Sequence, residues 1–263
     1  MTAPDDGPMN YVYRTEWALR LRFQEMLIAR DRDAFDRRIA DDPVYMPVRR
    51  FPRDGGRGTI AIFASQASGA SLEKLEFFRV IEQAPCNVVY VNDFRSSWYQ
   101  RGLVGFSTTI AETADCLARI LAPFPRPWTF IGSSSGGYAA LLFGALLRAE
   151  FVTAFSPQTL LTRHVLNLYG GHRTNAAELR AAPPWNDLLS LFASHGRPGR
   201  IALHFGEANE IDRRQARRLR GLTECTLSGY PATNHVIARW LSGRDLLMPA
   251  IVRGSHLGAA EPG

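Results

Sequence analysis

One short segment combines small residues with three consecutive serines, in the order Gly-Ser-Ser-Ser-Gly-Gly over residues 132–137. Its first five residues fit the pattern Gly-x-Ser-x-Gly, with Ser134 at the centre. In this pattern the serine occupies a tight, strained turn between a strand and a helix, and the two glycines avoid a Cβ clash. The turn would lift the serine hydroxyl above a sheet edge, at the positive end of the helix. This arrangement favours nucleophilic attack by Ser134 on an acyl carbonyl.

A glycine-rich turn of this kind can also hold a phosphate at a helix N-terminus. That alternative is less favoured, because no Lys-Ser or Lys-Thr pair follows the glycines and the pattern Gly-x-Gly-x-x-Gly is absent. The position of the segment after a short apolar run and before an apolar helix-like run supports the nucleophile hypothesis.

A serine hydroxyl needs a base to become a nucleophile, and His235 is the predicted base. It follows the last predicted strand and opens the last predicted helix, which agrees with the order serine, acid, histidine. A surface residue at a helix start is the alternative for this position. The other histidines lie in a predicted strand, in a long insertion or near the C-terminus: His204, His164, His172, His195 and His256.

The acid should follow the preceding strand, and Asp212 is the predicted residue, with Glu207 and Glu210 as alternatives. Asn209 stands where the commonest hydrolase pattern has an aspartate, but an amide cannot supply the negative charge. The acid must accept a hydrogen bond from the second nitrogen of His235 and stabilise the imidazolium. Asp212 could also serve as a helix N-cap, a role that does not exclude the first.

The developing oxyanion needs preorganised donors, and the backbone N–H of Ser135 is the first candidate. Gln66 is the predicted second donor, with Ala67 as the alternative, although the usual His-Gly pair is missing from this loop. Trp98 and Tyr99 follow a predicted strand and should face the site. They could line the substrate pocket or pack beneath the insertion.

The elements that position these residues alternate regularly between short apolar runs and helical periodicity. Unbroken apolar runs indicate strands buried on both faces, and their alternation with helices predicts a mostly parallel, doubly wound sheet. Ligands in such sheets bind at the carboxyl ends of the strands. The predicted strands are 59–64, 87–91, 128–131, 151–155, 201–205 and 225–227, and the predicted helices are 71–82, 108–121, 138–150, 213–220 and 234–241.

The chain is predicted to contain one core with additions. Residues 1–56 would form a helical and extended segment packed on the core, including a helix from about residue 14 to residue 40. Residues 57–250 would form the core, with a helical insertion at about 157–200 covering the active site, because this span is too long for a simple connection. Residues 251–263 are expected to form a C-terminal tail, loose from residue 254 onward.

The composition is that of a globular protein, since 46% of the 263 residues are hydrophobic and 21% are charged. The net charge of +6 comes almost entirely from arginine, and acids are interspersed with it, so no nucleic-acid partner is expected. Three separated cysteines without a Cys-x-x-Cys spacing predict neither disulfides nor a zinc site. The longest apolar run, 138–147, is too short to span a membrane, and the N-terminus lacks a signal-peptide pattern, so a cytoplasmic protein is expected.

Together the serine motif, the element order and the late histidine resemble the α/β-hydrolase superfamily over about residues 57–250. Residues 132–141, Gly-Ser-Ser-Ser-Gly-Gly-Tyr-Ala-Ala-Leu, followed by Ala-Phe-Ser-Pro-Gln at 154–158, look like a bacterial branch of hydrolases without an assigned activity. The resemblance implies ester, thioester or amide chemistry through an acyl-enzyme, on a small-molecule or carrier-bound acyl substrate, without metal or organic cofactor. Hydrolysis, acyl transfer and a non-catalytic binding module remain the three main functional hypotheses, and nucleic-acid binding through the arginine excess is a fourth, less favoured one.

Overall fold

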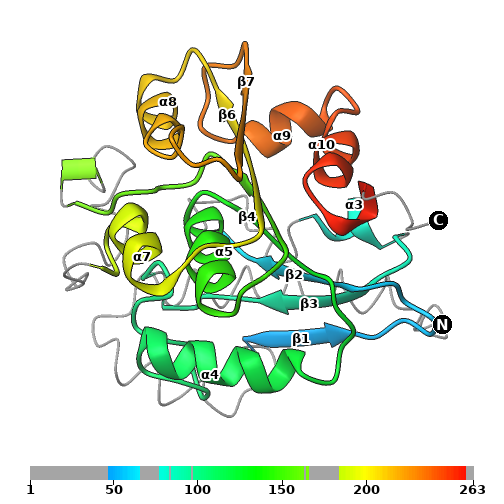
Figure 1. Cartoon of the computed structure of the whole chain (residues 1–263). Coiled ribbons are helices and arrows are strands. Elements are labelled where there is room, and N and C mark those ends of the chain that lie inside the picture. Colours follow the sequence, from blue (N-terminus) through cyan, green and yellow to red (C-terminus); the bar gives the residue numbers. More distant parts are fainter. Residues whose placement is uncertain are drawn as a thin grey trace, which may run out of the picture.

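A computed structural model of the chain describes residues 47–65, 77–82, 84–95, 97–162, 164–165 and 184–258. Its centre is a seven-stranded sheet in the order β1-β3-β2-β4-β5-β6-β7 (Figure 1). The strands are β1 (Val48–Phe51), β2 (Thr59–Phe63), β3 (Asn87–Val91), β4 (Trp128–Ser133), β5 (Phe151–Phe155), β6 (Arg200–Gly206) and β7 (Cys225–Tyr230).

The sheet is parallel except at one edge. β1 pairs antiparallel with β3, and all other neighbouring strands are parallel. The chain moves from β2 outward to β3, then crosses to the other side of β2 and continues through β4 to β7. The strand order therefore reverses between β2 and β4, and in open parallel sheets ligands bind at the carboxyl ends of the strands beside such a reversal.

Helices cover both faces of the sheet, which explains the unbroken apolar strands. In β2, Ala61 and Phe63 belong to one hydrophobic cluster, whereas Ile60 and Ile62 belong to the other. The first cluster includes side chains of α4 (Ile110–Leu121), α5 (Ser135–Leu146), α7 (Leu188–His195) and α8 (Glu210–Arg217). The second includes side chains of α3 (Phe78–Ile81), α9 (Ile237–Ser242) and α10 (Leu247–Arg253).

The predicted fold class is confirmed, and the six predicted strands are present with ends shifted by at most three residues. The edge strand β1 lies within the segment 1–56 that is predicted to be helical and extended.

The helix predicted at 14–40 and most of the insertion lie outside the described residues. The cover over the active site and the division of the chain into segments therefore stay predictions. Within the described ranges, no helix is long and apolar enough to cross a membrane.

The expectation of a C-terminal tail from residue 251, loose from residue 254, is wrong for residues 251–258. α10 continues to Arg253 and is followed by the short 3-10 helix η4 (His256–Gly258). Ile251 is fully buried, and the His256 ring nitrogen Nδ1 lies 2.7 Å from the Thr129 hydroxyl. The physical reason is the apolar pair Leu247 and Ile251, four residues apart, which gives α10 a face to bury against the sheet.

Candidate active site

Ser134 occupies the turn between β4 and α5, beside the reversal of strand order. Its φ of 52° and ψ of −120° are strained values for a residue with a side chain. The backbone N–H of Ser134 donates to the Phe155 carbonyl over 2.8 Å, which holds the turn against β5. The strained turn expected from the Gly-x-Ser-x-Gly motif is therefore present.

The two glycines of the motif are sterically required. A Cβ atom at Gly132 would lie 2.1 Å from the Gly136 carbonyl oxygen, and one at Gly136 would lie 2.1 Å from the Phe63 carbonyl oxygen. Both neighbours are backbone atoms, so a flexible side chain cannot give way. The absence of a side chain at these two positions lets β2, β4 and the start of α5 approach closely.

The structure brings Ser134, His235 and Asp212 into one hydrogen-bonded chain. The His235 Nε2 atom lies 2.8 Å from the Ser134 Oγ atom, and its Nδ1 atom lies 2.8 Å from the Asp212 Oδ1 atom. The Asp212 side chain has no exposed surface, whereas the His235 side chain is 27% exposed. In this order a carboxylate orients an imidazole, and the imidazole can remove the serine proton.

The two alternative acids have other partners. The Glu207 carboxylate lies 3.3 Å from Arg217, and the Glu210 carboxylate bonds Arg213 and Arg214. Their side chains are 43% and 49% exposed, so both glutamates belong to the charged surface of α8 and its preceding loop.

Asn209 has a different role from the one that its position suggested. Its side-chain oxygen accepts the Asp212 N–H over 3.1 Å, so Asn209 is the N-cap of α8. Its side-chain amide donates to the Thr233 carbonyl over 3.3 Å. The interpretation of Asp212 as the N-cap is therefore wrong, and Asn209 links the helix that carries Asp212 to the loop that carries His235.

Close backbone contact also positions that loop. A Cβ atom at Gly206, the last residue of β6, would lie 2.5 Å from the Ala232 carbonyl oxygen. The Glu207 N–H donates to the Tyr230 carbonyl over 2.7 Å, which continues the pairing of β6 with β7. These contacts hold the residues after β7 against the end of β6, so that His235 and Asp212 face each other.

Gln158, which was not among the predicted site residues, contacts both Ser134 and His235 directly. Its side-chain Nε2 lies 3.0 Å from the Ser134 Oγ atom and 3.5 Å from the His235 Nε2 atom. Its Oε1 accepts the Trp98 indole N–H over 3.1 Å, and the residue has no exposed surface. Gln158 follows β5 by three residues, so the rule that residues after each strand face the site could have identified it.

Trp98 and Tyr99 differ in what they contact. Trp98 is 3% exposed and reaches the site through Gln158. The Tyr99 hydroxyl lies 2.9 Å from the carbonyls of Ala64 and Val91, and its ring packs edge-on against Phe63. Tyr99 has no exposed surface, which supports packing rather than a substrate contact.

Of the two predicted oxyanion donors, Ser135 lies within the described residues and Gln66 does not. Ser135 is the first residue of α5, so its backbone N–H stands at the positive end of that helix, directly after Ser134. Gln66 and its alternative Ala67 lie outside the described residues. Both donor assignments stay predictions.

Burial determines the protonation of another histidine near the site. His204 lies in β6 and stacks on Phe155 and Tyr230. Burial lowers the pKa of His204 to about 4, so its ring is neutral at pH 7. As expected from the sequence, His204 belongs to the buried strand.

No protein-family model matches the chain, and no curated protein matches its sequence. Solved structures do match. The capsule O-acetyltransferase of Neisseria meningitidis serogroup A has a TM-score of 0.54 and 16% identity, over 78% of this chain and 92% of that one. FphF, a fluorophosphonate-binding serine hydrolase of Staphylococcus aureus, has a TM-score of 0.55 and 12% identity, over 74% of this chain and 83% of that one. The chain has the α/β-hydrolase fold. MPT51 of Mycobacterium tuberculosis is a third structure of this shape, with a TM-score of 0.52 and 16% identity, over 79% of this chain and 92% of that one.

Proposed function

We propose that the protein is a serine hydrolase that acts on an ester or thioester through an acyl-enzyme. The observation that carries this proposal is the chain of two 2.8 Å contacts from Asp212 through His235 to Ser134 on a strained turn. A serine without a base is a poor nucleophile, and a buried carboxylate behind the imidazole favours the tautomer that accepts the serine proton.

In the proposed acylation step, the Ser134 oxygen forms a bond to the acyl carbonyl carbon, and its proton passes to His235 Nε2. The carbonyl oxygen becomes an oxyanion, for which the N–H groups of Ser135 and Gln66 are the proposed donors. The bond to the leaving group then breaks, and His235 gives its proton to the departing oxygen or sulfur. Asp212 remains ionised and stabilises the imidazolium that forms between these two transfers.

The second half of the reaction repeats the first with water as the nucleophile. Water loses a proton to His235 as its oxygen attacks the acyl carbon. The bond from that carbon to the Ser134 oxygen breaks, and His235 returns the proton to Ser134. The products are a free carboxylic acid and the original enzyme, so no redox step or further reactant is required.

Acyl transfer to an alcohol or amine is the second candidate. Its support is the likeness in fold to a capsule O-acetyltransferase, over 92% of that protein. In this reaction an acceptor hydroxyl or amine replaces water in the second step, and the chemistry of the three residues is unchanged. The transfer reaction requires an acceptor that competes with water for the acyl-enzyme.

A fluorophosphonate probe tests the proposal without knowledge of the substrate. We expect covalent labelling of Ser134, identified by peptide mass spectrometry, with no labelling at that residue in Ser134→Ala and strongly slowed labelling in His235→Ala. Ser194→Ala, which changes a hydroxyl at the end of α7, is the matched control and should label normally. Folded wild-type protein that never labels would refute the proposal and favour a non-catalytic binding module.

Product analysis separates the two candidate reactions. Unlabelled wild-type enzyme is incubated with a panel of acyl esters and thioesters, with and without alcohols and amines as acceptors. Free acid as the product with every acceptor supports hydrolysis, whereas an acylated acceptor supports transfer.

A further inference from the structure

We propose that Gln158 is a fourth catalytic residue, whose side-chain amide donates a hydrogen bond to the Ser134 oxygen. This inference rests on the proposed function, because it assigns a role within the same reaction. The Gln158 Nε2 atom lies 3.0 Å from the Ser134 Oγ atom, which is closer than its 3.5 Å distance to the His235 Nε2 atom. Gln158 has no exposed surface, so it reaches Ser134 from the protein interior and leaves the exposed side to the substrate.

The neighbouring tryptophan determines which end of the amide faces the serine. An indole N–H can only donate a hydrogen bond, so the atom 3.1 Å from Trp98 Nε1 must be the amide oxygen of Gln158. The amide nitrogen, which can only donate, then faces Ser134. An amide turned the other way would place two donors together at Trp98 and leave the serine without this contact.

The hydroxyl of Ser134 can use all of these neighbours at once. Its single proton is directed to His235 Nε2, 2.8 Å away, and one oxygen lone pair accepts from Gln158. The second lone pair remains for attack on the acyl carbon. The contact therefore fixes the side-chain rotamer of Ser134 in the orientation in which its proton points at the base.

The same contact strengthens when charge develops on the serine oxygen. That happens in acylation as the proton leaves for His235, and again when the acyl-enzyme breaks down and the Ser134 oxygen is the leaving group. Hydrogen bonds to a charged acceptor are roughly twice as strong as those between neutral groups. The amide donation thus stabilises the transition states more than the resting hydroxyl, which is the condition for a contribution to rate.

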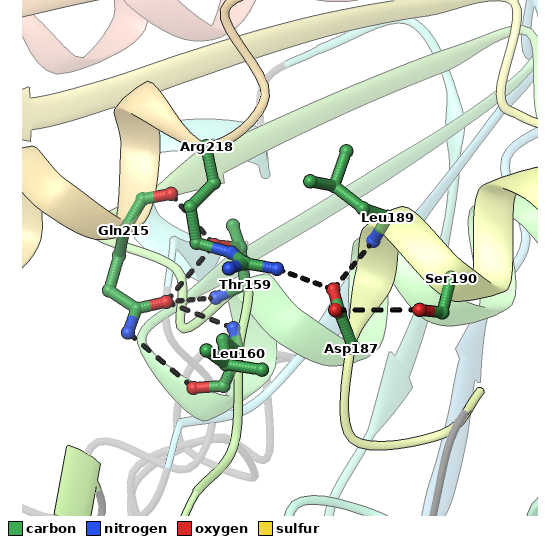
Figure 2. A network of polar contacts seen from close by, with 7 residues as sticks. All are labelled: Thr159, Leu160, Asp187, Leu189, Ser190, Gln215 and Arg218. Carbon is green, nitrogen blue, oxygen red and sulfur yellow. Dashed lines mark hydrogen bonds and ion pairs between the residues drawn. The ribbon is translucent and has the colours of Figure 1, made fainter.

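A second network holds the backbone next to Gln158 (Figure 2). The side-chain oxygen of Gln215 accepts the N–H groups of Thr159 and Leu160 over 2.7 and 2.9 Å, and the Thr159 hydroxyl donates to the Gln215 backbone carbonyl over 2.7 Å. Gln215 lies on α8, one turn after Asp212. The helix that carries the acid therefore also fixes the segment that carries Gln158.

The start of α7 is joined to this network. Asp187 caps α7 by accepting the Leu189 N–H over 3.0 Å, and its carboxylate also bonds Arg218, the C-cap residue of α8, over 2.6 Å (Figure 2). An ion pair between half-buried groups and a helix cap both limit motion of the residues around 187. Gln158 is thus positioned by Trp98 on one side and by α8 on the other.

The test compares fluorophosphonate labelling rates of wild type, Gln158→Met and Gln158→Glu at several pH values. Gln158→Met keeps the approximate volume and removes the donor, and we expect labelling about tenfold to a hundredfold slower, the range for a lost hydrogen bond to a charged group. In Gln158→Glu, the introduced carboxyl can donate only when protonated. The ratio of its rate to that of Gln158→Met should therefore rise above one as the pH falls, whereas relief of charge repulsion without donation would bring it no higher than one.

Trp98→Phe combined with Gln158→Met removes both partners of the indole contact and shows whether an unpaired N–H, rather than the lost donor, slows the reaction. Melting temperatures of all variants exclude unfolding as the cause. Wild-type labelling with an unchanged rate in Gln158→Met would overturn this inference and leave the proposed function intact. Absence of labelling in wild type would instead refute the proposed function.

Discussion

Replacing Asp212 by asparagine tests which acid supports His235. Asparagine has nearly the same shape but no charge, and its amide can present a donor to the His235 Nδ1 atom. The imidazole then loses both the charge that stabilises its protonated form and the tautomer that accepts the serine proton. We expect a folded protein with little reactivity at Ser134.

The structure allows the size of the charge effect to be estimated. The Asp212 side chain is fully buried, and its oxygen lies 2.8 Å from the His235 ring, so the two charge centres are about 4 Å apart. With an effective dielectric constant of about 20, a pair of unit charges at this distance interacts by about 4 kcal/mol. Since each 1.4 kcal/mol is about a factor of ten, labelling should slow by about a thousandfold.

The assay is the second-order rate of fluorophosphonate labelling, followed by gel fluorescence, with melting temperature as the check on folding. Glu207→Gln and Glu210→Gln are matched controls, because both remove a carboxylate from the same region and neither contacts His235. Their carboxylates are exposed and pair with arginines, so we expect changes smaller than about twofold. Normal labelling of folded Asp212→Asn, or loss of labelling in either control, would refute the assignment of the acid.

Two further predictions concern stability. Gly136→Ala places a Cβ atom 2.1 Å from a backbone oxygen, so we expect the free energy of unfolding, measured in urea, to fall by about 3 kcal/mol or more. Gly221→Ala is the control and should be nearly neutral, because the space around Gly221 is open. Equal stability of the two variants would contradict the steric argument. Burial lowers the pKa of His204 to about 4 from an ordinary 6.5, so the unfolded state binds more protons between these two values. The contribution of His204 to the free energy of unfolding is therefore fully present above pH 6.5 and falls as the pH is lowered toward 4. We expect His204 to account for a loss of about 2 kcal/mol between pH 7.5 and pH 5 that is absent in His204→Gln, and an equal loss in both proteins would show that His204 is not responsible.

The arginines in and directly after α8 pair with carboxylates close to them. In the sequence, acids are interspersed with the arginines, which argues against a nucleic-acid partner. In the structure Arg213 and Arg214 pair with Glu210, Arg217 pairs with Glu207, and Arg218 pairs with Asp187. The helix begins at Glu210 rather than at Arg213, because Asn209 provides the cap that the sequence analysis had not assigned to it.

Residues 251–258 are held by contacts with distant parts of the chain. Residues 251–263 are expected from the sequence to form a tail, loose from residue 254 onward. The apolar pair Leu247 and Ile251 nevertheless forms one buried face of α10, and His256 contacts Thr129 of β4 more than a hundred positions earlier. Contacts between residues so far apart in the chain depend on the assembled sheet, which local patterns do not describe.

The sequence by itself determined the sheet and the turn at Ser134. Unbroken apolar runs require burial on both faces, and glycines at 132 and 136 are the residues that permit backbone contacts of this closeness. Only the tertiary structure shows which acidic side chain contacts His235, because the three carboxylates have the same charge in the sequence. Asp212 on α8 lies beside the His235 ring, whereas Glu207, in the loop before α8, and Glu210 pair with arginines. The tertiary structure also revealed Gln158, since a side-chain amide has no distinguishing chemistry until a fold places Trp98 on one side of it and the Ser134 oxygen on the other.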